Sequence, residues 1–233
     1  MSSGRIWAVI PAAGIGSRMN SDTPKQYLEI DDKTILEHSI NRFLEHSKIH
    51  KVIVVLNPKD SHWQELPFKN NSRVVTVIGG KERVDSVLAG LHAIQEQEVS
   101  HHDWVMVHDA ARPCLKSEHI DDLIHSRDSS PDGAILAIGV TDTVKQANHK
   151  QTIDRTIDRE SIWLAQTPQL FPVDSLIRSI ELALSRQQLI TDEASAMELS
   201  GYHPSLVIGS RKNIKITEPE DLFLASLWLN NKK

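Results

Sequence analysis

The stretch AVIPAAGIGSRMNSDTPKQ, residues 8–26, decides the fold that we predict for this chain. It continues a short apolar run, residues 6–10 (IWAVI), which ends at Pro11 and is typical of a buried strand. Small residues follow at once and would let backbone N–H groups approach a ligand closely. These residues are Ala12, Ala13, Gly14 and Gly16. Together with two nearby cations, Arg18 and Lys25, they predict a cradle for a polyphosphate.

Two common phosphate-binding motifs do not fit this loop. A Walker A loop requires GxxxxGK[ST], but Gly14 and Gly16 are followed by Ser17 and Arg18, and the lysine comes too late. The dinucleotide fingerprint GxGxxG fails because Met19 occupies the place of its last glycine. An ordinary glycine turn between a strand and a helix is the alternative reading. We favour the phosphate cradle because of the added cations.

Composition sets the broad class of protein. The chain has 233 residues, of which 39% are hydrophobic and 24% charged, as in ordinary soluble globular proteins. A net charge of −5 gives no global field that would attract nucleic acid. No apolar run approaches the ~20 residues needed to cross a bilayer, and the first residues lack a secretory pattern. With only one cysteine, Cys114, no internal disulfide can form, so we expect a cytoplasmic protein.

Strand and helix patterns alternate along most of the chain. Further strand-like runs are predicted at residues 52–56, 74–78, 104–107, 134–138 and 205–208. Helical patterns are predicted for residues 34–44, from 83 onward, around 120–124, and at 173–187, 191–200 and 218–229. This alternation predicts an α/β fold, with one mostly parallel, Rossmann-like sheet that helices cover on both faces. Ligands of such sheets bind beyond the carboxyl ends of the strands, where the glycine loop, Gly79–Gly80 and Asp109 all fall.

The alternation of strand and helix patterns is interrupted between residues 141 and 169. Polar and apolar residues alternate over residues 152–157, and no helical stripe is present. We predict a projecting β-arm with a turn near residues 147–150. Because a lone two-stranded ribbon is only marginally stable in water, this arm is expected to need a partner surface.

The segment VHDAARP, residues 107–113, carries the second group of candidate functional residues. A carboxylate at a strand end, opposite a phosphate loop, is a natural ligand for Mg²⁺, so Asp109 is the predicted metal ligand. Arg112 is placed to clamp an anionic group. A surface ion pair between these two residues is the alternative. Beside the glycine loop and Lys25, the segment indicates phosphoryl or nucleotidyl transfer, in which the protein positions groups and neutralises charge.

At this point the chain resembles a known family, the 2-C-methyl-D-erythritol 4-phosphate cytidylyltransferases of the non-mevalonate isoprenoid pathway. The similar segments are PAAGIGSRM, PKQYL, GGKERVDSV, VHDAARPCL, TDEASAMEL and NIKIT. They extend from Pro11 to Asp221, nearly the whole chain. The resemblance implies a single nucleotidyltransferase domain over residues 1–233. It also implies that the phosphate of the acceptor attacks the α-phosphate of CTP, that pyrophosphate leaves, and that Mg²⁺ bridges the triphosphate.

The resemblance also assigns roles to individual residues. The implied catalytic residues, which would neutralise the α-phosphate, are Arg18, Lys25 and Lys215. The implied nucleotide-binding residues are Pro11, Ala12, Ala13, Gly14, Gly16, Gly80 and Ser86, and Asp109 is the implied metal ligand. The implied residues around the acceptor are Arg112, Thr143, Arg159, Thr167 and Thr191. The family forms a homodimer through the β-arm, so each site would borrow Thr143, Arg159 and Thr167 from the partner subunit.

Other readings stay open at the level of the sequence. The acceptor could be another polyol phosphate, such as ribitol 5-phosphate, or the chain could be a sugar-1-phosphate nucleotidyltransferase. A catalytically silent nucleotide-binding protein is the alternative from another class. We interpret His108 as structural, because a phosphate nucleophile is already ionised at neutral pH. Asp192 and Glu193 are read as charges that complement a helix N-terminus, and Lys81 as a residue that faces solvent.

Overall fold

The computed structural model describes residues 4–14, 23–97 and 99–230. The strands are β1 (Ile6–Pro11), β2 (Glu29–Ile30), β3 (Lys33–Thr34), β4 (Ile49–Leu56), β5 (Val74–Ile78), β6 (Trp104–Val107), β7 (Ala134–Gly139), β8 (Val144–Ala147), β9 (Ile153–Ile157), β10 (Trp163–Pro172) and β11 (Ser205–Ile208). The α-helices are α1 (Ile35–Leu44), α2 (Arg83–Gln95), α3 (Ser117–Ser126), α4 (Val173–Ser185), α5 (Glu193–Leu199) and α6 (Pro219–Asn230). Short 3-10 helices are η2 (Lys25–Tyr27), η3 (Trp63–Glu65) and η4 (Arg159–Ser161).

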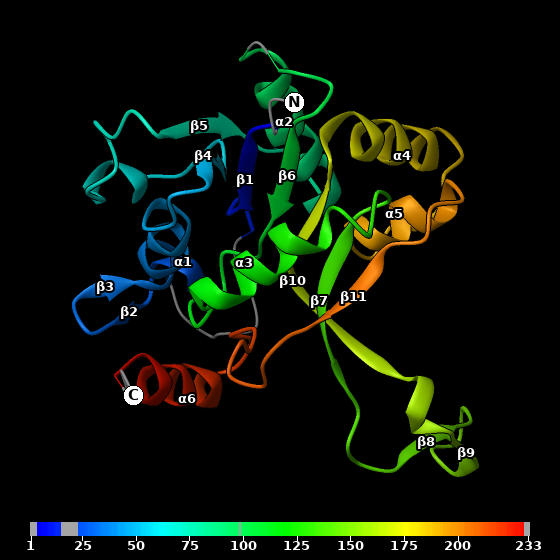
Figure 1. Cartoon of the computed structure of the whole chain (residues 1–233). Coiled ribbons are helices and arrows are strands. Elements are labelled where there is room, and N and C mark those ends of the chain that lie inside the picture. Colours follow the sequence, from blue (N-terminus) through cyan, green and yellow to red (C-terminus); the bar gives the residue numbers. More distant parts are fainter. Residues whose placement is uncertain (1–3, 15–22, 98, 231–233) are drawn as a thin grey trace.

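A seven-stranded sheet in the order β11-β7-β10-β6-β1-β4-β5 forms the centre of the molecule (Figure 1). Its neighbours β6, β1, β4 and β5 pair in parallel, as does β11 with β7. Strand β10 is antiparallel to both β6 and β7. The predicted α/β class with a mostly parallel sheet is therefore confirmed.

Helices bury apolar side chains against both faces of this sheet. On one face Leu36 and Phe43 of α1, and Leu123 of α3, pack with residues of β1 and β4 such as Ile10 and Val54. The opposite face carries the apolar stripes of α2, α4 and α5, which pack against Trp7, Val9, Ile53 and Val55. Alternate residues of β1 thus enter different cores, because successive side chains of a strand point to opposite faces. Helix α1 begins where its sequence predicts, at a capping box between Thr34 and Glu37.

The predicted arm is present, but its boundary at residue 169 is wrong. Strands β8 and β9 form a separate two-stranded ribbon that projects beyond the body of the molecule (Figure 1). The following segment, Trp163–Pro172, returns as β10 and inserts between β6 and β7. Gln169 pairs with both Val107 and Ile135. The apolar content of β10 fits a central strand, and its sequence gives no sign that its pairing partners are distant.

Helix α6 belongs to a third, smaller cluster. Cys114, Ile216 and Ala225 are buried there together with Ile30 and Ile35, at the end of the molecule near the β2–β3 hairpin (Figure 1). The segment around Lys215 is thereby fixed beside the body of the sheet. Within the described ranges, no helix is long and apolar enough to cross a membrane.

Candidate active site

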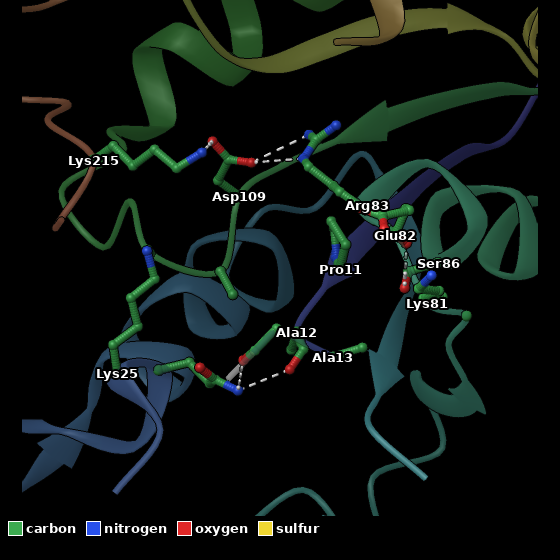
Figure 2. Close-up of a pocket in the computed structure, with 15 residues that line it drawn as sticks. Pro11, Ala12, Ala13, Lys25, Lys81, Glu82, Arg83, Ser86, Asp109 and Lys215 are labelled. Atoms are coloured by element: carbon green, nitrogen blue, oxygen red, sulfur yellow. Dashed lines mark hydrogen bonds and ion pairs between the residues drawn. The ribbon is translucent and has the colours of Figure 1, made fainter. Parts of the chain in front are cut away.

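A cavity of about 240 Å³ opens at the carboxyl ends of β1, β5 and β6 (Figure 2). Its lining combines the first loop, the start of α2, the segment after β6 and one lysine from near the C-terminus. The lining residues are Pro11, Ala12, Ala13, Gly14, Lys25, Gln26, Gly80, Lys81, Glu82, Arg83, Ser86, Asp109, Ala110, Ala111 and Lys215. This is the edge of the sheet at which ligands of open α/β folds bind.

The first loop is held by side chains from neighbouring segments. Gln26 donates through Nε2 to the carbonyl oxygens of Ala12 and Gly14, at 2.8 and 3.0 Å (Figure 2). Asn57 donates to the carbonyl oxygen of Ala13 at 2.9 Å. These bonds hold the carbonyl groups of residues 12–14 in place at the edge of the cavity. Gln26 lies in the PKQYL segment but is not among the site residues predicted from the sequence.

All described members of the predicted nucleotide-binding set line the cavity. They are Pro11, Ala12, Ala13, Gly14, Gly80 and Ser86. Gly80 is required by packing, because a Cβ atom there would lie 2.3 Å from the Cβ of Asp85. Lys81 is exposed at the rim of the cavity, as expected. The predicted contacts of Gly16 and Arg18 lie outside the described residues.

Lys25, Lys215 and Asp109 meet at this one cavity, although they come from distant parts of the sequence (Figure 2). The ammonium group of Lys25 donates to the carbonyl oxygen of Ile216, the residue after Lys215, at 3.2 Å. The backbone N–H of Ile216 in turn donates to the carbonyl oxygen of Ala111 at 2.9 Å. The NIKIT segment is therefore bonded to both of the other segments that carry candidate charges.

Asp109 is a buried carboxylate surrounded by three cations. Lys215 lies 3.0 Å from its Oδ2, Arg112 lies 3.4 Å from the same oxygen, and Arg83 lies 3.1 Å from its Oδ1. Burial by itself would raise the pKa of Asp109, but Arg83, Lys215 and Arg112 hold it well below its ordinary value. The carboxylate is consequently ionised at neutral pH, the state in which it can serve as a hard oxygen ligand.

Arg83 and Glu193 are the two charged residues that sequence reasoning missed. Arg83 bridges Asp109 to Glu193, whose Oε1 lies 2.6 Å from Nη1 of the guanidinium. Both acidic residues lie at the N-terminus of α5 as predicted, with Asp192 as its cap and Glu193 in its first turn. Glu193 is only 2% exposed, and its ion pair with Arg83 was not predicted. One signal could have found Arg83. It is the first residue of the helix that follows Gly79–Gly80, and this position brings it to the carboxyl edge of the sheet.

Arg112 is fixed by the NIKIT segment as well as by Asp109. Its Nη1 donates to the carbonyl oxygen of Asn213 at 2.6 Å. Asn213 also donates through Nδ2 to the carbonyl oxygen of Thr167, at 2.8 Å. The alternative of a surface ion pair between Arg112 and Asp109 is excluded, because both side chains are almost entirely covered.

Thr167 does not line the cavity, but it is buried against Asp109 within its own chain. Its hydroxyl accepts a hydrogen bond from the backbone N–H of Asp109 at 3.0 Å and lies 3.0 Å from Nδ1 of His108. His108 Nε2 must donate to the carbonyl oxygen of Arg112, so Nδ1 accepts from the Thr167 hydroxyl. The expectation that Thr167 is borrowed from a partner subunit is therefore wrong. The reason is that β10 returns beside β6 and places Thr167 against Asp109.

His108 is structural, as interpreted from the sequence. It is completely buried, and burial lowers its pKa to about 4, so the ring is neutral at pH 7. Both ring nitrogens are occupied within the fold.

None of the five predicted acceptor residues is part of the cavity lining. Thr143 and Arg159 lie on the exposed arm, and Arg159 donates to the carbonyl oxygen of Thr141. Thr191 is exposed just before α5, where its backbone N–H donates to Ser195 at 3.0 Å. Their predicted contacts with the acceptor stay predictions.

Among the described residues, Glu82 and Asp109 are the carboxylate residues that line the cavity, and of the two only Asp109 is buried. In this part of the chain, no group of three or more His, Cys, Asp or Glu side chains could hold a metal ion. Mg²⁺ usually takes one or two carboxylates and completes its coordination with substrate phosphates and water. The ionised Asp109, beside a loop suited to phosphates, fits that type of site. The predicted Mg²⁺ site at Asp109 stays a prediction.

The arrangement can now be compared with known proteins. The model of the IspD family, described as 2-C-methyl-D-erythritol 4-phosphate cytidylyltransferase, matches residues 6–231. The chain belongs to this family. Among IspD relatives, the cytidylyltransferase of Photorhabdus laumondii is 49% identical over 99% of this chain and 97% of its own. That of Shewanella sediminis is 51% identical over 99% of this chain and 96% of its own.

Solved IspD structures share the fold over almost the full length. The cytidylyltransferase of Francisella tularensis superposes with a TM-score of 0.83 at 38% identity, over 96% of this chain and 99% of that one. A 4-diphosphocytidyl-2C-methyl-D-erythritol synthase gives a TM-score of 0.83 at 36% identity, over 97% of this chain and all of the other. The resemblance stated from the sequence motifs is confirmed.

Proposed function

We propose that this chain transfers CMP from CTP to 2-C-methyl-D-erythritol 4-phosphate, in the synthesis of isoprenoid precursors. The products are 4-diphosphocytidyl-2-C-methyl-D-erythritol and pyrophosphate. The observation that carries the proposal is the meeting of Lys25, Lys215 and Asp109 at one cavity beside the small-residue loop, in a chain of the IspD family.

The reaction needs positioning and charge neutralisation more than acid–base chemistry. A phosphate monoester is mostly doubly ionised at pH 7, so the nucleophile needs no base. One of its oxygens forms a bond to the α-phosphorus of CTP while the bond from that phosphorus to the pyrophosphate oxygen breaks. Lys25 and Lys215, which line the cavity, would neutralise the charge that gathers on the α-phosphate. We assign Arg18 to the same task on the family resemblance.

We propose Mg²⁺ as the cofactor, with Asp109 as its protein ligand. When bound, the ion would offset the negative charge of the triphosphate. Asp109 contributes an ionised, buried carboxylate, and the residue is held in place by the hydrogen bond from its backbone N–H to the Thr167 hydroxyl and by its three cationic neighbours. CTP and polyol phosphates are metabolites of the cytoplasm, where we place the reaction.

We also propose that the enzyme works as a homodimer joined through its arm. Leu164, Leu206 and Ile208, at the base of the arm and on the sheet edge, are 54%, 47% and 66% exposed. Exposed apolar side chains of this size favour a protein partner. Thr143 and Arg159 also favour a dimer. Both lie outside the cavity of their own chain, so their predicted contacts with the acceptor would be made in the cavity of a partner subunit.

The activity is tested by pyrophosphate release. The purified chain is incubated with each of the four nucleoside triphosphates and with either 2-C-methyl-D-erythritol 4-phosphate or ribitol 5-phosphate, with and without Mg²⁺. We expect release only with CTP, and a far higher kcat/KM for the methylerythritol phosphate. Preference for ribitol 5-phosphate would show that the acceptor is wrong. Equal use of all four nucleotides would contradict the assignment of CTP.

A further inference from the structure

Arg83 holds two buried carboxylates at once, and the proposed reaction uses only one of them. Its Nε and Nη2 lie 3.2 and 3.1 Å from Oδ1 of Asp109. Its Nη1 and Nη2 lie 2.6 and 3.2 Å from the two oxygens of Glu193. Burial by itself would lower the pKa of this guanidinium, but Glu193 and Asp109 raise it. Arg83 thus links the cavity to the first turn of α5.

Glu193 lies in the first turn of α5 but is not its cap. The helix is already capped by Asp192, whose side chain accepts from the backbone N–H of Ser195 at 2.9 Å. The side chain of Glu193 is 3% exposed, and in the described part of the chain its oxygens are bonded by Arg83 alone. A buried carboxylate costs several kcal/mol to desolvate unless it is well paired. Its presence is therefore explained by the guanidinium that it binds.

The two oxygens of Asp109 are both occupied by cations. Arg83 takes Oδ1, while Lys215 and Arg112 take Oδ2. A metal ion can bind this carboxylate only if at least one oxygen is given up. If Asp109 were the single carboxylate partner of Arg83, the guanidinium would lose its ion pair when it moved away from Oδ1. Arg83 keeps a bidentate ion pair with Glu193 instead.

We infer that Arg83 is a positioning residue that yields Oδ1 of Asp109 to the metal, and that Glu193 is the carboxylate that retains Arg83 when it does so. The inference rests on the proposed function, in which Asp109 is the metal ligand. Without the charge of Glu193, Arg83 would bind Asp109 more tightly and would compete with the metal. Glu193 therefore controls metal affinity from a position that touches neither substrate nor metal.

The test measures metal binding separately from turnover. Mn²⁺ binding to the enzyme–CTP complex is followed by electron paramagnetic resonance in the absence of an acceptor, and the Mg²⁺ activation constant is measured in parallel. We expect Glu193→Gln to weaken Mn²⁺ binding by about tenfold and to raise the Mg²⁺ activation constant by a similar factor. This is the range found for residues that support metal ligands. At saturating Mg²⁺, kcat should stay near that of the wild type. An unchanged Mn²⁺ affinity in this variant would overturn the inference.

The double variant Arg83→Gln/Glu193→Gln distinguishes competition from general damage. It removes the competing cation together with its anchor, so Mn²⁺ should bind at least as tightly as in the wild type. A double variant as weak as Glu193→Gln would show that Arg83 does not compete for Asp109. If Glu193→Gln does not fold, Glu193→Asp keeps the charge on a shorter side chain. It should weaken Mn²⁺ binding in the same direction, and no weakening there would overturn the inference.

Asp103→Asn is the matched control. Asp103 is also a buried carboxylate paired with an arginine, since its Oδ2 lies 3.1 Å from Nε of Arg5, but it lies before β6 whereas Asp109 follows that strand. We expect this variant to lose stability and keep its Mn²⁺ affinity. A change equal to that of Glu193→Gln would mean that the metal effect is only a loss of stability. Failure of the proposed function would appear separately, as a wild-type chain that binds Mn²⁺ and CTP without releasing pyrophosphate.

Discussion

Lys25 and Lys215, two of the lysines that line the cavity, come from different segments of the chain. Lys25 begins the short helix η2 directly after Pro24, whereas Lys215 lies on an irregular segment near the C-terminus. Lys215 is bonded to Asp109 at 3.0 Å, and Lys25 donates to the carbonyl oxygen of Ile216. Both ammonium groups are therefore placed at the cavity, although the two lysines are distant in the sequence.

Lys25→Ala tests this assignment. We expect kcat to fall by about two to three orders of magnitude while CTP affinity falls by less than about tenfold, because the charge acts mainly in the transition state. Steady-state kinetics and CTP titration separate the two effects. Lys33→Ala, which removes an exposed lysine from β3, is the control and should keep wild-type turnover. A near-normal kcat in Lys25→Ala would contradict the assigned role.

At the scale of the element, α6 is secured by a small core rather than by the main sheet. Cys114 is 7% exposed, and its thiol lies 3.8 Å from the carbonyl oxygen of Ala225 in α6. Burial raises the pKa of this thiol from 9.0 to about 11. The docking of α6 is consequently linked to the protonation of one cysteine.

Stability should fall in alkaline solution because of this thiol. The unfolded chain releases the Cys114 proton above pH 9.0, whereas the folded chain keeps it up to about pH 11. The stabilisation is therefore complete below pH 9.0 and is lost as the pH rises towards 11, by up to about 3 kcal/mol. Urea unfolding at several pH values measures the slope. Cys114→Ala should show a smaller decline over this window, and an identical decline would contradict the prediction.

At the scale of the whole molecule, the proposed dimer joins the exposed arm of one subunit to the cavity of the other. The ribbon β8–β9 has few buried side chains of its own, and Ile153 is 66% exposed. A ribbon of this kind is marginally stable in isolation. Contact with a second copy would stabilise it and would bring Arg159 to the neighbouring site.

Mixed subunits test the exchange of arms. Lys25→Ala and Arg159→Ala chains are unfolded together and refolded at equal amounts. Each mixed dimer then holds one site with both residues intact, so about a quarter of wild-type activity should return in a symmetric dimer that pairs at random. Mixtures of Lys25→Ala and Lys215→Ala should stay inactive, because both lysines serve the cavity of one chain. No recovery in the first mixture would contradict the swapped arm.

The sequence alone determined those features that depend on local patterns. The period of apolar residues fixed the type of most elements, and capping at Thr34 and Asp192 fixed where two helices begin. Because parallel strands end at one edge, the order of strands also brought Gly80 and Asp109 to the same cavity. The family motifs added the names of the catalytic candidates.

Only the tertiary structure decided which charges are paired and which strand fills the centre of the sheet. The local pattern of residues 163–169 predicts arm, because nothing local reveals that the partners of β10 are β6 and β7. The sequence predicts Glu193 as a charge at a helix N-terminus, but its burial and its partner, Arg83, arise from contacts between distant segments. Periodicity reports which way a side chain faces along its own element. Ion pairs and the insertion of a strand depend on which residues of other elements come to lie opposite. Those neighbours are determined only when the chain has folded.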